Sequence, residues 1–326
     1  MKRATLLLAM ALLASVAWGA SAAEAKKAAL TFGVCLPQLD NEGFRVNLDS
    51  IQVVTDHAGI KTLPFSANNS AETQMLQIED LIVKGVDAII FTPVDADAMS
   101  TAVEKANKAK IPIVAMDRST SGGKLTGLVE SDNVAHGRGA ADLMASAAKK
   151  AGLPLAKLKV LELLGAQATS AGLERHKGFA DRAKELGIPI VSALPTEWQS
   201  DKANSATMDA FQANPDINAI FEASDVAMHA GVESALKQIG KLHASSEKAH
   251  IIITTVDGGP KGIEAVKNGY IDGIAAQQLI MMGKKAAEMA IAAQQGKAIK
   301  ESVIRFPPDM VTPENATSKD HWANQL

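Results

Sequence analysis

The sequence predicts an α/β protein of two lobes, each with a parallel sheet covered by helices. Short apolar runs alternate with amphipathic helical patterns along the chain, which is typical of parallel strands joined by crossover helices. About ten such runs occur, more than a single compact unit of about 150 residues would hold. The helix expected between two of the runs is missing, which indicates a crossover from one lobe to the other.

The apolar runs are short and lack clear alternation, as expected for strands that are buried on both faces. We expect strands at residues 29–35, 60–65, 88–92, 111–116, 125–129, 158–164, 188–194, 219–222, 251–256 and 271–276.

Helical periodicity separates most of these strands. In residues 72–83, apolar side chains including Met75 and Ile78 share one face, and Gly85 follows as a stop signal. Residues 134–150 form a second such pattern. After residue 118 the chain instead reads Ser-Thr-Ser-Gly-Gly-Lys, forms a short strand and then reaches capping residues. This places the boundary between the lobes at about residues 119–132.

The N-terminus has the pattern of a secretory signal peptide. Lys2 and Arg3 precede an apolar run at residues 5–17 and small residues at 20–23. The run is too short for a transmembrane helix, which needs about 20 apolar residues. We expect residues 1–22 to be removed on export to the periplasm; a retained membrane anchor is the alternative.

Charge and cysteine content narrow the class further. The net charge is −3, and loss of Lys2 and Arg3 leaves 31 basic against 36 acidic residues, a net charge of −5. Such a balance argues against nucleic acid or an anionic membrane as a partner. The single cysteine, Cys35, cannot form an internal disulfide and is expected to be a buried side chain at a strand end.

Motifs for catalysis or cofactor binding are missing. The sequence has no G-x-S-x-G, P-loop or H-E-x-x-H motif, and residues 137–139 lack the third glycine of a dinucleotide fingerprint. His229, His243 and His250 do not have metal-ligand spacing and are expected to face solvent. We expect a protein that is not an enzyme and uses no cofactor or metal.

Polar and aromatic side chains follow the predicted strands, where open parallel sheets bind ligands. They are rich in Asp, Asn, Gln and Arg, with an aromatic residue from each half. Carboxylate, amide and guanidinium groups pair with adjacent hydroxyls, and aromatic rings stack on the apolar face of a sugar. This mixture predicts carbohydrate binding. The stretches are residues 37–44, 92–95, 117–118, 167, 175, 197–198, 224–225, 257–259 and 277.

Trp198 is expected to form a stacking wall of the site. Trp18 belongs to the signal peptide and Trp322 to a polar tail, so Trp198 would be the only tryptophan within the mature fold. Other interpretations stay open. Trp198 could pack over a lobe edge, and Asn41 and Asp257 could serve only as helix caps.

The remaining candidates also have plain structural explanations. Asp117 and Arg118 could form a surface ion pair at a strand end. Arg175 could be a charge on the face of a helix. Gln277, beside Gln278, has the least defined role.

Six segments in chain order resemble the ribose-binding-protein branch of the periplasmic sugar-binding proteins of ABC transporters. The resemblance runs from about residue 29 to about residue 304. It implies two Rossmann-like lobes joined by three hinge strands, the type I periplasmic-binding-protein fold, with the sugar enclosed between them. The segments are residues 84–93 (KGVDAIIFTP), 111–118 (IPIVAMDR), 131–133 (SDN), 169–175 (TSAGLER), 221–225 (FEASD) and 256–258 (VDG).

The resemblance also implies limits for the two lobes and a set of ligand contacts. We expect an N-terminal lobe of residues 26–131 plus 278–305 and a C-terminal lobe of residues 132–277 plus 306–326. The resemblance implies that a set of polar and aromatic side chains contacts the ligand: Asn41, Phe44, Asp117, Arg118, Arg175, Trp198, Asp257 and Gln277, with Ser224 at a position where the relatives carry Asn.

Three departures bear on the ligand. Gly43 stands where the relatives carry the first of two consecutive aromatics, Ser224 replaces Asn, and Cys35 replaces a usual Ser. They predict a pocket that is wider on one wall, with at least one altered hydroxyl contact. Ribose is therefore in doubt, and another pentose, a hexose or a polyol is as good a candidate.

These expectations combine into a function. We expect a monomeric periplasmic receptor that captures a sugar or polyol and delivers it to an inner-membrane ABC permease, with a chemoreceptor as a further candidate partner. Two alternatives remain: a receptor for a furanose-like or other non-sugar signal, and an exported enzyme that acts on a sugar. The absence of an N-terminal DNA-binding helix-turn-helix argues against a sugar-responsive repressor.

Overall fold

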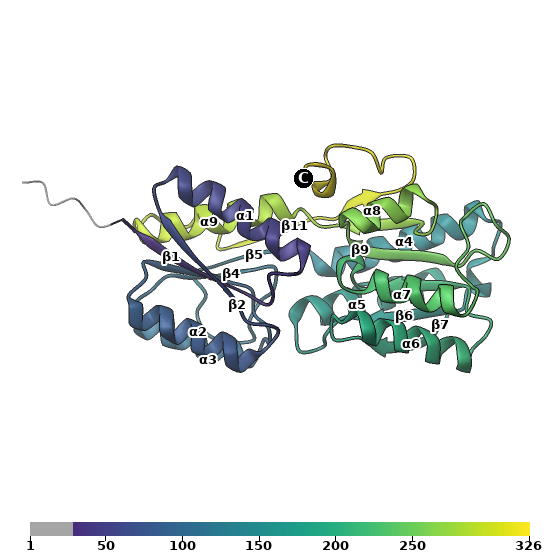
Figure 1. Ribbon diagram of the computed structural model, residues 1–326, viewed down its shortest axis with the longest axis horizontal. Helices are drawn as coiled ribbons and strands as arrows, with labels where there is room; N and C mark the ends of the chain where they lie inside the picture. The colour runs from purple at the N-terminus through teal and green to yellow at the C-terminus, as the bar shows by residue number, and fades with distance from the viewer. Residues whose placement is uncertain (1–28) are drawn as a thin grey trace, which may run out of the picture.

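The protein forms two α/β lobes that lie side by side (Figure 1). The computed structural model describes residues 29–326, and the predicted signal peptide lies outside this range. Each lobe is built on a six-stranded sheet whose two faces are covered by helices. The predicted fold class is confirmed.

The sheet of the first lobe has six parallel strands in the order β11-β5-β4-β3-β1-β2. Its central strands are buried on both faces, which explains their continuous apolar sequences. The strands are β1 (Thr31–Leu36), β2 (Lys61–Ser66), β3 (Ala88–Phe91), β4 (Ile113–Met116), β5 (Gly127–Ser131) and β11 (Val303–Phe306).

The sheet of the second lobe has the matching order β12-β10-β9-β8-β6-β7. Its strands are parallel except for the edge strand β12, which runs antiparallel to β10. The strands are β6 (Val160–Leu164), β7 (Ile190–Pro195), β8 (Ala219–Glu222), β9 (Ile252–Asp257), β10 (Gly273–Ala276) and β12 (Asp309–Val311).

Helices connect the strands and cover the sheets. In the first lobe, α1 (Glu42–His57) lies beside α9 (Leu279–Gln294), a helix from the far end of the chain (Figure 1). The other helices of this lobe are α2 (Ala71–Lys84) and α3 (Ala98–Lys108). The second lobe carries α4 (Asn133–Lys150), α5 (Ser170–Leu186), α6 (Ser200–Ala213), α7 (Asp225–Gln238), α8 (Pro260–Lys267) and the short 3-10 turns η1 (Leu155–Lys157) and η2 (Trp322–Asn324).

Local sequence signals set the ends of several helices. The side chains of Ser70, Asp132 and Thr169 each accept a hydrogen bond from the backbone N–H three residues on, at the starts of α2, α4 and α5. Helix α2 ends at Gly85 in the left-handed conformation, with φ 66°, as the sequence predicts. No helix in residues 29–326 is both long and apolar enough to cross a membrane.

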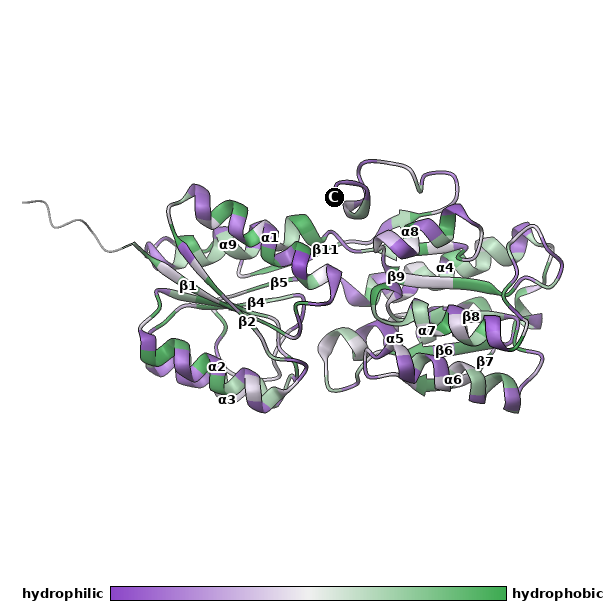
Figure 2. Ribbon diagram, in the orientation of Figure 1, coloured by the Kyte–Doolittle hydropathy of each residue, from purple (hydrophilic) through white to green (hydrophobic). Residues whose placement is uncertain are grey.

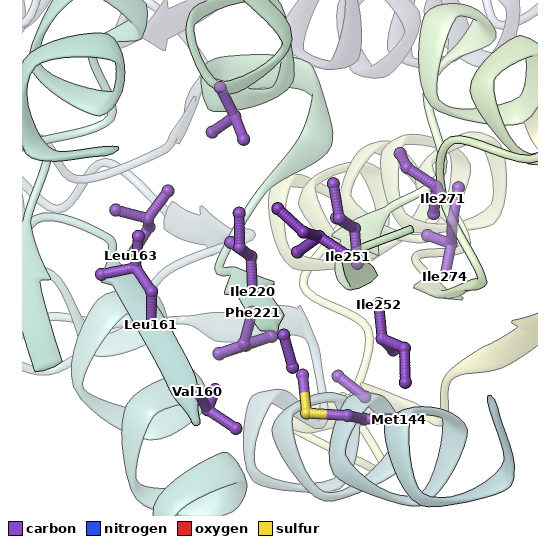
Figure 3. Packing of buried hydrophobic residues seen from close by; sticks show 14 of the residues in the cluster. Met144, Val160, Leu161, Leu163, Ile220, Phe221, Ile251, Ile252, Ile271 and Ile274 are labelled. Atoms are coloured by element: carbon purple, nitrogen blue, oxygen red, sulfur yellow. The ribbon is translucent and has the colours of Figure 1, made fainter. Parts of the chain in front are cut away.

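Each lobe has its own apolar core. Hydropathy colouring shows helices that are apolar on one side and polar on the other (Figure 2), the pattern of helices that pack on a sheet. In the second lobe, Leu161, Ile220 and Ile252 pack within one cluster (Figure 3). The rings of Phe179 and Phe221 stack there with centroids 4.0 Å apart. Cys35 is fully buried, as predicted, and burial raises the pKa of its thiol to about 12.

All ten predicted strands occur, with ends within two residues of the expected ones. The predicted absence of a helix between β4 and β5 is also confirmed. Two strands were not predicted, β11 and β12. They are four and three residues long and lie at sheet edges with partly exposed residues, so their sequences carry little periodicity.

The chain passes between the two sheets three times. These crossings follow β5, β10 and β11, so α9 and β11 return to the first lobe after the second sheet is nearly complete. The predicted lobe limits lie at these crossings, the last of them inside β11. The division into 26–131 plus 278–305 and 132–277 plus 306–326 remains our proposal.

Two expectations about exposure are wrong. Trp322, placed in a polar tail, is 3% exposed and packs in the apolar cluster of the first lobe. Trp198 is therefore not the only tryptophan within the fold. His229, expected in solvent, is buried and contacts the Glu222 carboxylate at 3.0 Å. The His250 ring likewise contacts Asp272 at 2.9 Å. Sequence spacing gave no sign of these buried partners.

Candidate functional site

One cavity between the lobes brings the predicted ligand residues together. It lies where the carboxyl ends of both sheets face each other, the position expected for ligands of open parallel sheets. The first lobe contributes residues from the start of α1 and the end of β4, and the second lobe contributes α5 and the ends of β7, β8, β9 and β10. All nine predicted residues line the cavity: Asn41, Phe44, Asp117, Arg118, Arg175, Trp198, Ser224, Asp257 and Gln277.

Arginine and aromatic side chains stack across the cavity. The Arg118 guanidinium lies 5.4 Å from the Phe44 ring centroid and 5.5 Å from the Trp198 ring centroid, within cation–π range. The Arg175 guanidinium lies 5.6 Å from the Trp198 ring. Phe44 and Trp198 belong to opposite lobes, so this stack joins the two walls. Trp198 packs so closely on Gly165 that a Cβ there would fall 2.0 Å from the ring.

A hydrogen-bond network fixes the Asp257 side chain. One carboxylate oxygen accepts from Arg175 Nη1 at 2.8 Å and from Gln277 Nε2 at 2.6 Å, and the other accepts from the Ser224 hydroxyl. Arg175, which is 3% exposed, also donates to the Ala223 carbonyl at 2.7 Å. These bonds offset the cost of burying the charged pair.

Asp117 is held less tightly. Its carboxylate lies 3.4 Å from Arg118 Nε, longer than a strong charge-assisted hydrogen bond. Burial raises the pKa of Asp117 above its usual range, although the guanidinium groups of Arg118 and Arg175 act in the opposite direction. Burial also lowers the pKa of Arg118, and Asp117 opposes that effect. The pair therefore retains bonding capacity toward a ligand.

Two of the lining residues have a buried donor without a hydrogen-bond partner in the part of the chain that the structure describes. Among residues 29–326, neither Arg118 Nε nor Trp198 Nε1 has a hydrogen-bond acceptor. A buried donor left unpaired costs about 1–3 kcal/mol. An entering ligand with hydroxyl oxygens could supply acceptors and remove this cost.

The helix-cap alternatives are partly correct. The Asn41 side chain accepts from the Phe44 N–H at 3.3 Å, and the Ser224 hydroxyl accepts from the Ala227 N–H at 3.0 Å. Both residues cap a helix and also line the cavity. Asp257 does not cap α8, whose N-cap is Gly259. Asp225 instead accepts from the Gly258 and Gly259 N–H groups at 2.9 and 2.8 Å.

Several lining residues were not predicted. Gln38 lies after β1, within the predicted stretch 37–44, but was not named as a ligand residue. Asn69 lies after β2, where the same strand-end reasoning could have identified it. Leu279 begins α9 and contacts Gly43, lying 3.2 Å from the position of a Cβ there. The wall expected to be wider is thus occupied by Leu279. The remaining additions are Asn47, Ala171, Val226 and Ala227.

Direct hydrogen bonds join the lobes at the rim of the cavity. The Ala96 N–H donates to the Ala168 carbonyl at 2.9 Å, and the Ser119 N–H donates to the Ser170 hydroxyl at 2.9 Å. The lobes therefore contact each other around the site. Within residues 29–326, no group of His, Cys, Asp and Glu side chains could hold a metal ion.

Two lobes of matching strand order, joined by three chain crossings around a polar cavity, define a two-lobed solute-binding protein. The chain belongs to the periplasmic binding protein family: the model described as "Periplasmic binding protein domain" matches residues 32–298. This family is made up of solute-binding proteins rather than enzymes, and the predicted resemblance is confirmed.

Curated relatives and solved structures agree with this assignment. The ribose import binding protein of Salmonella typhimurium is 31% identical over 309 residues, covering 95% of this chain and 97% of that protein. Its Bacillus subtilis counterpart is 31% identical, with 88% of each chain covered. An ABC transporter periplasmic solute binding protein from Actinobacillus succinogenes, with bound D-allose, aligns with a TM-score of 0.77 and 28% identity over 88% of this chain and 99% of that one.

Proposed function

We propose that this protein captures a neutral sugar or polyol between its lobes and delivers it to an ABC importer. The observation that carries the proposal is the convergence of nine residues, from strand ends and from helices α1 and α5 of both lobes, in one cavity. Two aspartates and two arginines are among them, so their formal charges cancel. A cavity of balanced charge, rich in donors and acceptors and bounded by aromatic rings, suits an uncharged ligand with many hydroxyls.

Capture would proceed by closure of the lobes around the ligand. Asp117 and Arg118 from the first lobe and Trp198 from the second would contact opposite sides of the same molecule. Because the ligand then bridges both walls, it favours the closed arrangement over the open one. A membrane permease can distinguish the closed form from the open form by shape.

The cellular setting is also part of the proposal. The predicted signal peptide, residues 1–22, supports export to the periplasm, where an inner-membrane ABC permease would receive the ligand. A monomeric state suits a carrier that docks alone on its permease. Contact with a chemoreceptor is a further proposal that rests on the resemblance alone.

Relatives define the compounds to test. The two curated relatives described above are named as ribose import binding proteins, and two further relatives are named for xylitol and D-allose. A solved structure from Bacillus halodurans, at 25% identity, is described with bound myo-inositol. We expect at least one of ribose, allose, arabinose, xylitol and myo-inositol to raise the melting temperature of the mature protein. At 100 times its dissociation constant a ligand stabilises by about 2.7 kcal/mol.

Charged analogues provide the control. Glucosamine and galacturonate should produce little shift, because the cavity carries balanced charge. A shift with a charged compound and none with the neutral panel would contradict the proposal. Product formation from a bound sugar would support the enzyme alternative instead.

A further inference from the structure

The C-terminal segment, residues 309–326, returns from the second lobe to the junction of the lobes. It begins as β12, makes a loop and ends in η2, above the region where the lobes meet (Figure 1). Its own contacts fix the end of the loop. The buried His321 ring contacts the Asp309 carboxylate and the Asn315 carbonyl, and the Asn324 amide donates to the Ala316 carbonyl at 2.9 Å.

Trp322, within this segment, contacts both lobes. Its indole Nε1 donates to the backbone carbonyl of Asp257 at 2.8 Å, at the end of β9 in the second lobe. Its ring belongs to the same apolar cluster as Leu279 and Met282 of α9 in the first lobe. The residue is 3% exposed, so both contacts are shielded from water.

The Asp257 backbone needs such support. Its φ is 98°, a conformation that residues other than glycine rarely adopt and that persists only where neighbours enforce it. The Asp257 carbonyl also accepts from the Gln277 N–H at 3.1 Å. Arg175 and Gln277 hold the carboxylate on the cavity side, while Trp322 holds the carbonyl from outside the cavity.

We propose that Trp322 is a positioning residue for the ligand site. Its indole N–H fixes the strained backbone of Asp257, and through it the orientation of the carboxylate and of Gln277. The ring also anchors the C-terminal segment to α9, which begins two residues after Gln277. This inference rests on the proposed function, because Asp257 and Gln277 are proposed ligand residues.

The test replaces Trp322 with phenylalanine, which keeps a buried aromatic ring and removes the N–H. Gln325→Ala is the matched control, because Gln325 lies in the same segment and is exposed, and among residues 29–326 its side chain bonds only to the Asp320 carbonyl. Hydrogen–deuterium exchange is measured without ligand. We expect faster exchange at the Gly258, Gly259 and Gln277 amides in Trp322→Phe, with the control matching the parent. Unchanged exchange at these three amides would overturn the proposal.

Affinity provides the second measurement, made with whichever of D-ribose, D-allose, D-arabinose, xylitol and myo-inositol gives the parent the largest melting shift. Loss of one neutral hydrogen bond should weaken binding about 2- to 10-fold in Trp322→Phe and leave Gln325→Ala unchanged. A lower melting temperature with unaltered affinity and exchange would indicate a purely structural role. If the parent binds no compound of the panel, the proposed function fails, and the exchange result still decides the role of Trp322.

Discussion

Asp117 and Asp257 hold matching places in the two lobes, yet their surroundings differ. Each lies at the end of the third strand of its sheet, β4 or β9, counted from the edge formed by β11 or β12, and both have positive φ. Both carboxylate oxygens of Asp257 accept hydrogen bonds from protein donors. Among the described residues, the Asp117 carboxylate has a single, long contact with Arg118, at 3.4 Å. We infer that Asp117 bonds the ligand directly and that Asp257 mainly orders its own wall of the cavity.

Asp117→Asn should therefore weaken binding without lowering the stability of the free protein. A hydrogen bond to a charged group contributes about 1.5–3 kcal/mol, so the dissociation constant should rise roughly 10- to 150-fold. Burial raises the pKa of Asp117, and its contact with Arg118 is long at 3.4 Å, so the ionised group is a cost to the folded state that this ion pair offsets less than the Arg175–Asp257 pair does. Replacement by a neutral side chain of the same size should therefore leave the unliganded melting temperature equal or higher. Calorimetric titration measures the dissociation constant, and thermal denaturation without ligand measures the melting temperature. A clear drop in the unliganded melting temperature would be inconsistent with this role.

Asp257→Ala should behave differently, since it leaves the Arg175 guanidinium buried without its counter-ion. Breaking a buried ion pair from one side costs about 3–5 kcal/mol. We expect a lower unliganded melting temperature as well as weaker binding. A charge in an open, wet cleft would contribute little to stability, but Asp257 is only 8% exposed. The double variant Asp257→Ala, Arg175→Met should regain part of the lost stability; no recovery would mean that the ion pair is not the cause.

Sequence reasoning was effective for residues that follow strands and weak for contacts between distant segments. The rule that ligands bind at the carboxyl ends of parallel strands is enough to group Asn41, Arg118 and Gln277 at one site. The contact of Trp322 with Asp257 joins residues 65 positions apart and depends on the path of an irregular loop. No periodicity encodes such a path.

At the scale of single elements, the paired strands β5 and β11, each followed by a chain crossing between the lobes, carry a titratable group. Glu130 of β5 is 1% exposed and accepts from Arg305 Nε of β11 at 2.9 Å. Burial first, then the charge of Glu174, raises the pKa of Glu130 to about 7, although Arg305 opposes this. The folded protein thus holds a proton on Glu130 that the unfolded chain releases near its ordinary pKa of 4.5.

The parent should consequently lose stability as pH rises from about 4.5 to about 7, by up to about 3 kcal/mol from this group. Below 4.5 both states are protonated and the contribution is fully present. Glu130→Gln cannot ionise, so its stability curve should be flatter than that of the parent across this window. Chemical denaturation at several pH values, with parent and variant in parallel, measures the difference. Parallel curves would show that Glu130 does not titrate there.

The start of α5 provides a second element-scale prediction. Ser170 accepts a hydrogen bond from the Ser119 N–H of the other lobe and is not among the cavity-lining residues. Ser170→Ala should weaken the closed arrangement and so raise the apparent dissociation constant about 2- to 10-fold. The exposed Ser205→Ala in α6 is the control. Equal affinities of the two variants would remove Ser170 from the closure contacts.

Most strands could be predicted from the sequence because they are buried and consist of short apolar runs, as in β3 and β9. The edge strands β11 and β12 were missed because so few of their residues are buried. Their pairing depends on the sheets already in place, which local sequence does not report.

At the scale of the whole molecule, each lobe depends on distant parts of the chain. Helix α9 packs on α1, and β11 pairs with β5. Fragments 29–131 and 132–326 should therefore fail to fold alone, because the first lacks α9 and β11 and the second exposes their apolar faces. Circular dichroism melts of each fragment should show no cooperative transition, and co-expression should restore one. A cooperative transition in the isolated first fragment would contradict the proposed lobe limits.

The late position of β11 and β12 also has a consequence for the order of events during synthesis. A ribosome makes the chain from residue 1 onward, and neither sheet can acquire its last strand until residues 303–311 have emerged. The first lobe, although most of its residues precede the second lobe in the chain, must wait for residues 303–306. For the proposed exported protein, this delay keeps the nascent chain from completing either lobe early. An incompletely folded chain is the form that can pass through a narrow membrane pore.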